Sequence, residues 1–387
     1  MICVKKRVRY ITSNYDVEFV LQYNVMRNLE NSYCIEVNCT IRSLEPCKKC
    51  DGSRALFTCA IPRRCVCLLA YLLSSIADEK NPPTYFSGIE VYNSECRIEN
   101  REEVAAELDR IQPSHTFMSA GITGRPNIDW CEDHKVETIR TNVIGTLNVA
   151  DLTYMRNIHN MVYATGCIFK YDEAHPMGSG IGFVEEDKPN FDGSFYSKTK
   201  GYMEPLLACY DNTLILRVRM PISDDLIHRS FVTKIAKYEK VVNVPNSMTI
   251  LYEMLPASLA MAQKGLTGVY NFCNPGVISH NEVLDLFKKY IDPNFEYKNF
   301  SVEEQAKILK ADRSNNELDA TKLLRDMPEE VVINDIKTAF ELCFQRMKVN
   351  LLKSGVLPDN LPKEFTTKVN GGTGKPVEPA GDVATSN

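Results

Sequence analysis

The sequence predicts an α/β fold in which a doubly wound parallel sheet is joined to a smaller C-terminal lobe. Between about residue 55 and residue 219, short apolar segments alternate with amphipathic helical segments. Such alternation is typical of a parallel sheet that is covered by helices on both faces. Hydrophobic residues make up 44% of the 387-residue chain and charged residues 25%, which is the balance of an ordinary globular protein.

Residues 1–54 are irregular, and their polar runs indicate no recognisable fold. After them we predict five elements, in the order strand 55–61, helix 68–80, strand 88–91, helix 99–111 and strand 115–118. The helix at 99–111 has the clearest pattern, because Val104, Leu108 and Ile111 fall on one helical face.

The following segment continues the alternation. Its predicted elements are helix 136–155, strand 161–165, a loop over 166–195 that is rich in glycine, proline and acidic residues, a helix from about residue 196, and strand 213–219. Residues 220–344 mix short elements with helices and indicate the smaller lobe. We expect the tail, 368–387, to be disordered because it is rich in Gly, Pro, Ser and Thr.

Charge and hydropathy exclude several classes of partner. The net charge is −5 and the pI about 5.8, without a dominant basic patch, so nucleic acid is not an expected partner. The first residues lack the apolar core of a secretory signal. The longest apolar stretch, 65–77, is too short to span a bilayer. We therefore expect a cytoplasmic protein that does not insert into a membrane.

The chain contains 14 cysteines, which we interpret as reduced thiols because no export signal is present. Cys47 and Cys50 have the spacing of a zinc-ligand pair. Structural zinc sites usually add a matching second pair, and Cys65 and Cys67 do not supply one. We therefore expect no metal.

Tyr196 and Lys200 stand four residues apart at a predicted helix start, so their side chains share one face. A ketone that accepts a hydride becomes an alkoxide and needs a proton. Tyrosine, with an ordinary pKa of about 10, is a poor acid–base group at neutral pH, and a nearby ammonium lowers its pKa. Thr165 ends a strand, where an open α/β sheet places ligand-binding hydroxyls. The alternative interpretation of Tyr196 and Lys200 is an ordinary exposed helix turn, and that of Thr165 is a simple strand cap.

Six stretches extend this observation: 119–152 (from SAGITGRP), 163–207 (YATGCIF to YSKTKGYMEPLL), 216–223 (LRVRMPIS), 238–251 (YEKVVNVPNSMTIL), 271–284 (NFCNPGVISHNEVL) and 313–323 (RSNNELDATKL). In these stretches the chain resembles the nucleotide-rhamnose synthase epimerase/reductases of plants and some giant viruses. That group lies in the dTDP-4-dehydrorhamnose reductase branch of the extended short-chain dehydrogenase/reductases. The resemblance runs from about residue 86 to residue 345.

The resemblance implies a Rossmann-like NAD(P)-binding domain over 55–220, clear from about residue 86, and a mainly substrate-binding lobe over 221–345. It implies an oxidoreductase in which NADPH, or NADH, reduces C4 of a nucleotide-linked 4-keto-6-deoxyhexose to give nucleotide-L-rhamnose. The nucleotide, dTDP or UDP, stays open, as does the formation of a homodimer.

The resemblance also implies roles for individual residues. Tyr196 is the expected proton donor, Lys200 tunes it and anchors the nicotinamide ribose, and Thr165 binds the keto oxygen. The expected cofactor contacts are made by Tyr196 and Lys200, by Asn142, which is also a structural and proton-relay residue, and by the backbone of Ser119, Ala120 and Gly121. Asn246 and Arg313 are expected to contact the substrate. Arg313 suits the acidic nucleotide because a guanidinium binds phosphate in a bidentate manner.

A second activity, epimerisation at C3 and C5, needs a base on one face of the sugar and an acid on the other. In bifunctional relatives a cysteine and a lysine are the candidates, and Cys167 and Lys234 stand at the matching positions. A buried small apolar residue and a solvated helix lysine are the alternative interpretations. Whether the chain has this activity stays open.

The sequence departs from the family where the first strand should meet a glycine-rich turn. Those glycines let the cofactor pyrophosphate approach the helix N-terminus, but residues 59–65 contain none. Either residues 1–85 are not the natural segment, for example through a misassembled coding sequence, or the chain is a paralogue with weakened cofactor binding. The composition of residues 1–85 favours the first explanation.

Two other functions fit the same resemblance. The regulatory beta subunit of methionine adenosyltransferase resembles this reductase family and is a non-catalytic binding partner. The complete set of Thr165, Tyr196 and Lys200 argues against that role here. An epimerase or dehydratase of the extended family would instead retain NAD⁺ tightly.

Overall fold

The computed structural model describes the backbone of residues 2–12, 15–27, 33–42, 54–58, 90–94 and 96–353, except 125–126 and 228–229. Side chains are described for residues 92, 94 and 96–353, with the same two gaps. The chain divides into two units, Met1–Gly52 and Ser53–Asn387. The predicted helix at 68–80, the cysteines at 47, 50, 65 and 67, and the tail at 368–387 lie outside the described residues.

No fold was predicted for the first unit, and its described residues form three strands. Strands β1 (Ile2–Thr12), β2 (Tyr15–Arg27) and β3 (Tyr33–Arg42) form an antiparallel sheet in the order β1-β2-β3.

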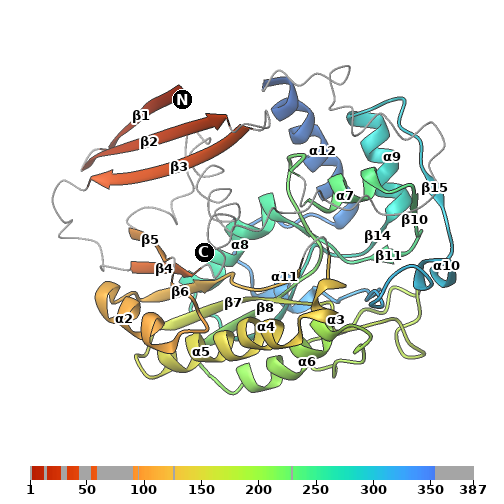
Figure 1. The fold of residues 1–387 in the computed structure, drawn as a ribbon, viewed down its shortest axis with the longest axis horizontal. Helices are drawn as coiled ribbons and strands as arrows, with labels where there is room; N and C mark the ends of the chain where they lie inside the picture. The colour runs from red at the N-terminus through yellow and green to blue at the C-terminus, as the bar shows by residue number, and fades with distance from the viewer. Residues whose placement is uncertain are drawn as a thin grey trace, which may run out of the picture. The chain divides into compact units, whose positions relative to one another are not determined.

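The second unit is built on a six-stranded parallel sheet, which confirms the predicted fold class (Figure 1). Its strands, in spatial order, are β13 (Gly268–Phe272), β8 (Thr213–Val218), β7 (His159–Thr165), β6 (His115–Met118), β4 (Arg54–Thr58) and β5 (Glu90–Ser94). The chain runs from β4 outward to β5 and then returns to the other side of β4 with β6. This reversal creates a switch point at the carboxyl ends of β4 and β6, where open α/β sheets bind ligands.

Helices cover both faces of this sheet because strand residues alternate between the faces. Beneath the sheet in Figure 1 lie α2 (Arg101–Ile111), α5 (Thr146–Tyr154) and α6 (Phe195–Leu207). They pack with Val162 and Ile215, whereas Met161 and Leu214 belong to the core under α8 (Leu251–Gln263) on the other face. The predicted helix at 99–111 is confirmed as α2, which Asn100 caps by accepting a hydrogen bond from Glu103 N.

The predicted helix at 136–155 is confirmed with one change of geometry. It consists of α4 (Lys135–Ile139), a π-helical turn η2 (Arg140–Gly145) and α5, and it follows the short α3 (Trp130–Asp133). Such turns widen a helix locally and occur frequently at functional sites. Here the turn contains Asn142.

The C-terminal lobe has its own apolar core. It is formed largely by α7 (Phe231–Lys237), α9 (His280–Tyr290) and α12 (Ile336–Lys353), whose buried side chains pack together. The other elements of the lobe are the short strands β9 (Pro221–Ile222), β10 (Lys240–Val241), β11 (Pro245–Asn246), β12 (Thr249–Ile250), β14 (Ile278–Ser279) and β15 (Lys298–Asn299), and the helix α10 (Val302–Ala306). Helix α11 (Thr321–Asp326) follows them in the chain, but its Leu323 belongs to the core under α8.

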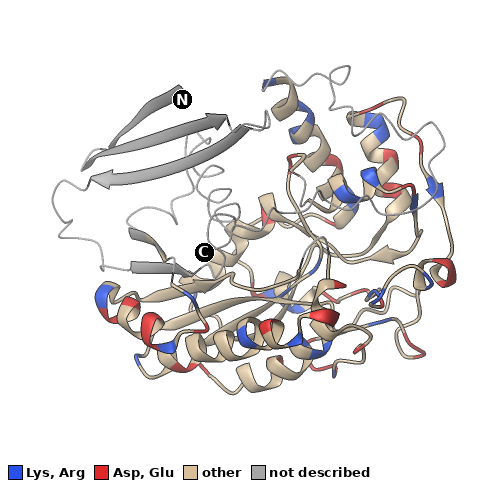
Figure 2. Ribbon diagram, in the orientation of Figure 1, with Lys and Arg blue, Asp and Glu red and all other residues tan. Residues whose placement is uncertain are grey.

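Part of the segment predicted as the lobe belongs to the sheet instead. Helix α8 covers one sheet face, and β13 pairs with β8 as a sixth strand. The chain therefore returns to the sheet after first entering the lobe at β9. Figure 2 shows acidic and basic residues interspersed along the outer helices. None of the helices in the described part of the chain is both long and apolar enough to cross a bilayer.

Candidate active site

The predicted catalytic residues meet at the carboxyl edge of the sheet. Thr165 is the last residue of β7, and Tyr196 lies in the first turn of α6. Their side chains are hydrogen-bonded to each other. Thr165, Tyr196 and Lys200 are all buried, with 6%, 9% and 5% of their surface exposed. An exposed helix turn is therefore excluded for Tyr196 and Lys200.

Helix α6 starts where local hydrogen bonds fix it. Ser194 is the N-cap, and its hydroxyl accepts a bond of 3.0 Å from Ser197 N. The next backbone amide, Phe195 N, donates to Glu132 Oε1 of α3 at 2.7 Å. These two contacts satisfy amides that have no partner inside the helix, and they hold Tyr196 at a fixed point beside Thr165.

One face of α6 carries a buried polar row of Tyr196, Lys200 and Glu204, each one helical turn after the last. The row ends in a buried ion pair, because Arg217 Nη2 of β8 lies 2.7 Å from Glu204 Oε1. Arg217 also donates to Asn271 Oδ1 at 3.2 Å. The pair ties α6 to the sheet and so fixes the direction in which Tyr196 and Lys200 point.

Lys200 faces the chain segment that follows β6. A Cβ atom on Gly121 would lie 3.9 Å from Lys200 Nζ and 3.5 Å from Asn142 Oδ1. Asn142 in turn holds this segment, since Ile122 N donates to its Oδ1 at 2.8 Å and its Nδ2 donates to Ile122 O at 2.9 Å. Three of the predicted cofactor residues, Gly121, Asn142 and Lys200, are thus brought together at the switch point.

These residues fit the ribose of a nicotinamide cofactor. Lys200 is buried and forms no ion pair with any carboxylate in the described part of the chain. Its ammonium is free to bond ribose hydroxyls, while Gly121 lets the cofactor pass close to the backbone. The turn that would hold the pyrophosphate, residues 59–65, lies outside the described residues.

Burial shifts the pKa of both Tyr196 and Lys200. The pKa of Tyr196 is raised above its usual value, mainly by burial and then by the nearby Cys167, while Thr165 and Arg219 oppose the rise. Burial lowers the pKa of Lys200 from 10.5 to about 8. The sequence led us to expect that Lys200 lowers the pKa of Tyr196. The structure differs because burial disfavours the phenolate.

A second cluster lies next to Thr165 and contains a residue that the sequence analysis missed. Arg219 Nη1 donates to Cys167 Sγ at 3.0 Å, and Cys167 N donates to Thr165 Oγ1 at 3.1 Å. Arg219 Nη2 also donates to Asn246 Oδ1. The predicted residues Cys167 and Asn246 are therefore joined through Arg219. The one sequence signal was an arginine at the end of an apolar strand.

Two predicted residues lie apart from these contacts. Arg313 Nη1 donates to Asp129 Oδ1 at 2.9 Å and to Ala311 O at 2.6 Å. An acidic ligand would therefore have to bind its other donors or displace Asp129. Lys234 lies on α7 with a half-buried side chain. No cluster of three or more His, Cys, Asp or Glu side chains in the described part of the chain is arranged to hold a metal.

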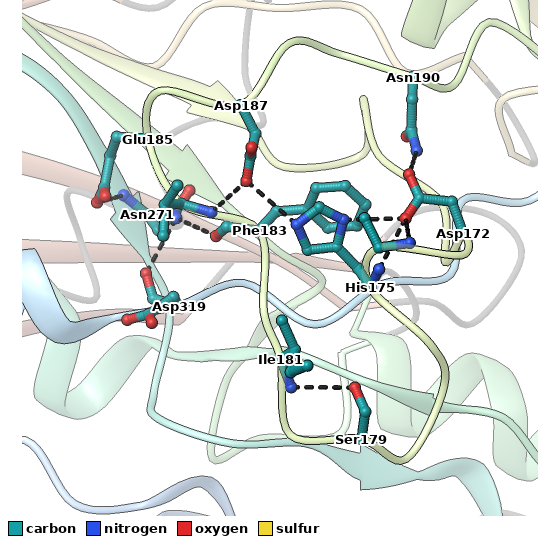
Figure 3. Close-up of polar contacts among 12 residues, drawn as sticks. Asp172, His175, Ser179, Ile181, Phe183, Glu185, Asp187, Asn190, Asn271 and Asp319 are labelled. Atoms are coloured by element: carbon teal, nitrogen blue, oxygen red, sulfur yellow. Dashed lines mark hydrogen bonds and ion pairs between the residues drawn. The ribbon is translucent and has the colours of Figure 1, made fainter.

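The predicted loop between Thr165 and Tyr196 has internal structure (Figure 3). His175 Nδ1 lies 2.9 Å from Asp172 Oδ1, and its Nε2 lies 3.4 Å from Asp187 Oδ2. The imidazole stacks on Phe183 with 3.8 Å between ring centroids. Asn271 of β13 donates to Phe183 O at 2.8 Å. The loop is thereby attached to β13 of the sheet. This attachment helps to hold Thr165 and Tyr196, at the two ends of the loop, in fixed positions relative to each other.

Replacing Lys200 by methionine should stabilise the protein at pH 7. A buried lysine whose pKa falls from 10.5 to about 8 costs folding energy below pH 8, and the cost disappears as the pH rises toward 10.5. The shift corresponds to about 3 kcal/mol. Melting temperatures should show Lys200→Met above the wild type at pH 7, with the difference shrinking toward pH 10. A difference in melting temperature that does not change with pH would contradict the assignment of Lys200 as a buried lysine with a lowered pKa.

Comparison with known proteins agrees with this geometry. Residues 71–218 match the NAD dependent epimerase/dehydratase family. A bifunctional dTDP-4-dehydrorhamnose 3,5-epimerase/dTDP-4-dehydrorhamnose reductase of Arabidopsis thaliana is 60% identical over 248 residues, which cover 63% of this chain and 82% of that protein. The match to the family starts at residue 71, after the segment that lacks the glycine turn.

Two solved structures have the same fold. The UDP-rhamnose synthase of Acanthamoeba polyphaga mimivirus superposes with a TM-score of 0.68 and 35% identity, covering 76% of this chain and all of that one (100%). A dTDP-4-dehydrorhamnose reductase from Bacillus anthracis, solved in complex with NADP, superposes with a TM-score of 0.59 over 76% of this chain and 99% of that one. At 19% identity, the second likeness bears on the fold alone.

Proposed function

Since the chain belongs to the nucleotide-rhamnose synthase epimerase/reductases, within the NAD-dependent epimerase/dehydratase family, we propose that it reduces a nucleotide-linked 4-keto-6-deoxyhexose to nucleotide-L-rhamnose. The proposed cofactor is NADPH, which supplies the hydride when bound. The observation that carries the proposal is the buried arrangement of Thr165, Tyr196 and Lys200 at the carboxyl edge of the sheet.

Each of the three residues has a part that its environment supports. Tyr196 gives its phenolic proton to O4 of the sugar as the carbonyl becomes an alcohol. The raised pKa keeps the phenol protonated before the reaction, which is the form a donor needs. Thr165, hydrogen-bonded to Tyr196, orients the keto oxygen. Lys200 holds the ribose and, once the ligand is bound, offsets the negative charge that remains on Tyr196.

We propose epimerisation at C3 and C5 as a second activity of the same site. Cys167 removes a proton from the carbon beside the keto group, and the electron pair passes into the enolate. Lys234 returns a proton on the opposite face, so the configuration inverts without net oxidation. The support is that Cys167 N donates to Thr165 Oγ1, so that Cys167 lies beside the residue proposed to bind the keto oxygen.

The non-catalytic alternative is not favoured. A regulatory paralogue has no need of a buried lysine without a carboxylate partner, because such a charge costs stability and has value only if a ligand meets it. The substrate nucleotide, a cytoplasmic location and a homodimer remain predictions.

The function is tested by supplying the purified protein with dTDP- or UDP-4-keto-6-deoxyglucose and either NADPH or NADH. We expect nucleotide-L-rhamnose as the product, identified by NMR, with faster turnover on NADPH. A parallel reaction starts from the sugar already inverted at C3 and C5, so that reduction is measured even if epimerisation is absent. Lack of product from both sugars would reject the proposal.

A further inference from the structure

The guanidinium of Arg219 is a buried charge with an unusual environment among the described residues. Only 1% of its surface is exposed, yet it forms no ion pair with a carboxylate in the described part of the chain. Its Nε is buried without a hydrogen-bond partner. Buried cations are normally paired, because removing a charge from water is costly unless an opposite charge lies nearby.

Arg217, two residues earlier on the same strand, provides an internal comparison. Its exposure is 2%, almost the same as that of Arg219, but it has the Glu204 carboxylate at 2.7 Å. Among the described residues, one of these two buried arginines therefore has a carboxylate counterion and the other has none. The unpaired one is the one that lies beside the candidate catalytic residues.

The contacts of Arg219 direct its charge at Cys167. The stem of Arg219 crosses Gly166 so closely that a Cβ atom there would lie 2.9 Å from Arg219 Cγ. This approach brings Nη1 to 3.0 Å from Cys167 Sγ. The other partners, Ser314 Oγ at 3.2 Å, Ser314 O at 3.1 Å and Asn246 Oδ1, are neutral acceptors that orient the guanidinium without neutralising it.

The backbone around Cys167 is held separately from its sulfur. Cys167 N bonds Thr165 Oγ1, and Asn316 Nδ2 donates to Gly166 O and to Phe169 O, both at 3.0 Å. Thr165 and Asn316 thus hold the backbone on both sides of Cys167, whereas Arg219 contacts the Cys167 side chain.

We propose that Arg219 is the counterion of a Cys167 thiolate and thereby makes Cys167 competent as the epimerisation base. A cation beside a cysteine favours the thiolate, and a hydrogen bond between charged groups is stronger than one between neutral groups. The thiolate accepts the proton from the carbon beside the keto group, forming an S–H bond, and Arg219 keeps its own protons throughout. Arg219 is therefore a positioning residue, and its catalytic role rests on the proposed epimerase function.

The pair is tested first without substrate. Iodoacetamide labelling of the Cys167 peptide at pH 7 is followed by mass spectrometry in the wild type, Arg219→Met and Arg219→Lys. We expect labelling to slow by about tenfold or more in Arg219→Met and by less than about threefold in Arg219→Lys, because only the thiolate reacts. Cys209, which is exposed and bonds Pro205 O, is the control and should react equally in all variants.

A second variant keeps the arginine and supplies the missing carboxylate. Asn246→Asp places an anion on the atom that already accepts from Arg219 Nη2. This carboxylate competes with Cys167 for the charge, so labelling of Cys167 should slow by about threefold or more. If Arg219→Met does not fold, this variant decides the question. Unchanged or faster labelling of Cys167 in Asn246→Asp, or in a folded Arg219→Met, overturns the pair.

The catalytic arm measures exchange of solvent deuterium into C3 and C5 of the keto sugar. Arg219→Met should slow the deuterium exchange by about tenfold or more, and Cys167→Ser should abolish it almost entirely. In the Cys167→Ser background, Arg219→Met should cause no further loss. If the wild type neither exchanges deuterium into the sugar nor reduces it, the proposed function is rejected. Iodoacetamide labelling then still tests whether Arg219 stabilises the Cys167 thiolate. Normal exchange in Arg219→Met overturns the role of Arg219 alone.

Discussion

Tyr196→Phe is expected to lower the reduction rate by about a hundredfold to ten-thousandfold, the range for loss of a positioned proton donor. The substitution removes a single oxygen, and that oxygen is hydrogen-bonded to Thr165 at the carboxyl edge of the sheet. Without it, the phenolic group that is proposed to protonate the sugar O4 is missing, and the Thr165 hydroxyl that stays beside this position is a much weaker acid. The rate should be followed as NADPH oxidation with the sugar already inverted at C3 and C5, so that epimerisation does not limit turnover.

Tyr202→Phe is the matched control for this variant. Tyr202 lies on the same helix but is 67% exposed, so its hydroxyl should be dispensable. Binding of NADPH should persist in Tyr196→Phe, because Lys200 and the segment at Gly121 are intact. If Tyr196→Phe and Tyr202→Phe turn over equally, Tyr196 is not the proton donor.

Glu204→Gln is expected to destabilise the second unit by about 3–5 kcal/mol, because it leaves the charge of Arg217 buried without a counterion. Arg217 Nε and Nη2 both donate to this carboxylate, and both residues are almost fully buried. The loss should be measured by urea unfolding. Activity should fall as well, since the pair sets the orientation of the α6 row that carries Tyr196 and Lys200.

Asp133→Asn provides the control for this prediction. The Lys310–Asp133 pair is as short as the buried pair, at 2.6 Å against 2.7 Å, but its side chains are 63% and 57% exposed. Its loss should cost less than about 1 kcal/mol. A double change of Glu204 and Arg217 to leucine should recover part of the stability lost in Glu204→Gln. If Glu204→Gln and Asp133→Asn lower the free energy of unfolding equally, burial does not determine how much the Glu204–Arg217 pair contributes to stability.

Local periodicity was enough to predict much of the sheet domain. The spacing of Val104, Leu108 and Ile111 gave α2, and the spacing of Tyr196 and Lys200 correctly placed both on one buried face of α6. Glu204 continues that spacing, so its place in the row was also available from the sequence. Its partner was not, because the ion pair depends on β8 lying beside α6 in the fold.

Tertiary partners explain what the sequence analysis missed. Arg217 and Arg219 are equivalent in the sequence, two arginines near the end of an apolar strand, and only the fold distinguishes the paired one from the unpaired one. Helix α8 and β13 were assigned to the wrong lobe because a buried apolar helix looks the same in either. The predicted direction of the Tyr196 pKa shift was wrong because burial, followed by Cys167, raises this pKa.

The most direct measurement supplies NADPH carrying deuterium at C4 of the nicotinamide, together with the nucleotide-linked 4-keto sugar that is already inverted at C3 and C5. The account predicts nucleotide-L-rhamnose with deuterium at C4 of the sugar from the wild type, and at most a trace of it from Tyr196→Phe. A folded wild-type protein that binds the labelled cofactor but transfers no deuterium to that carbon would contradict the assignment of this site as a reductase.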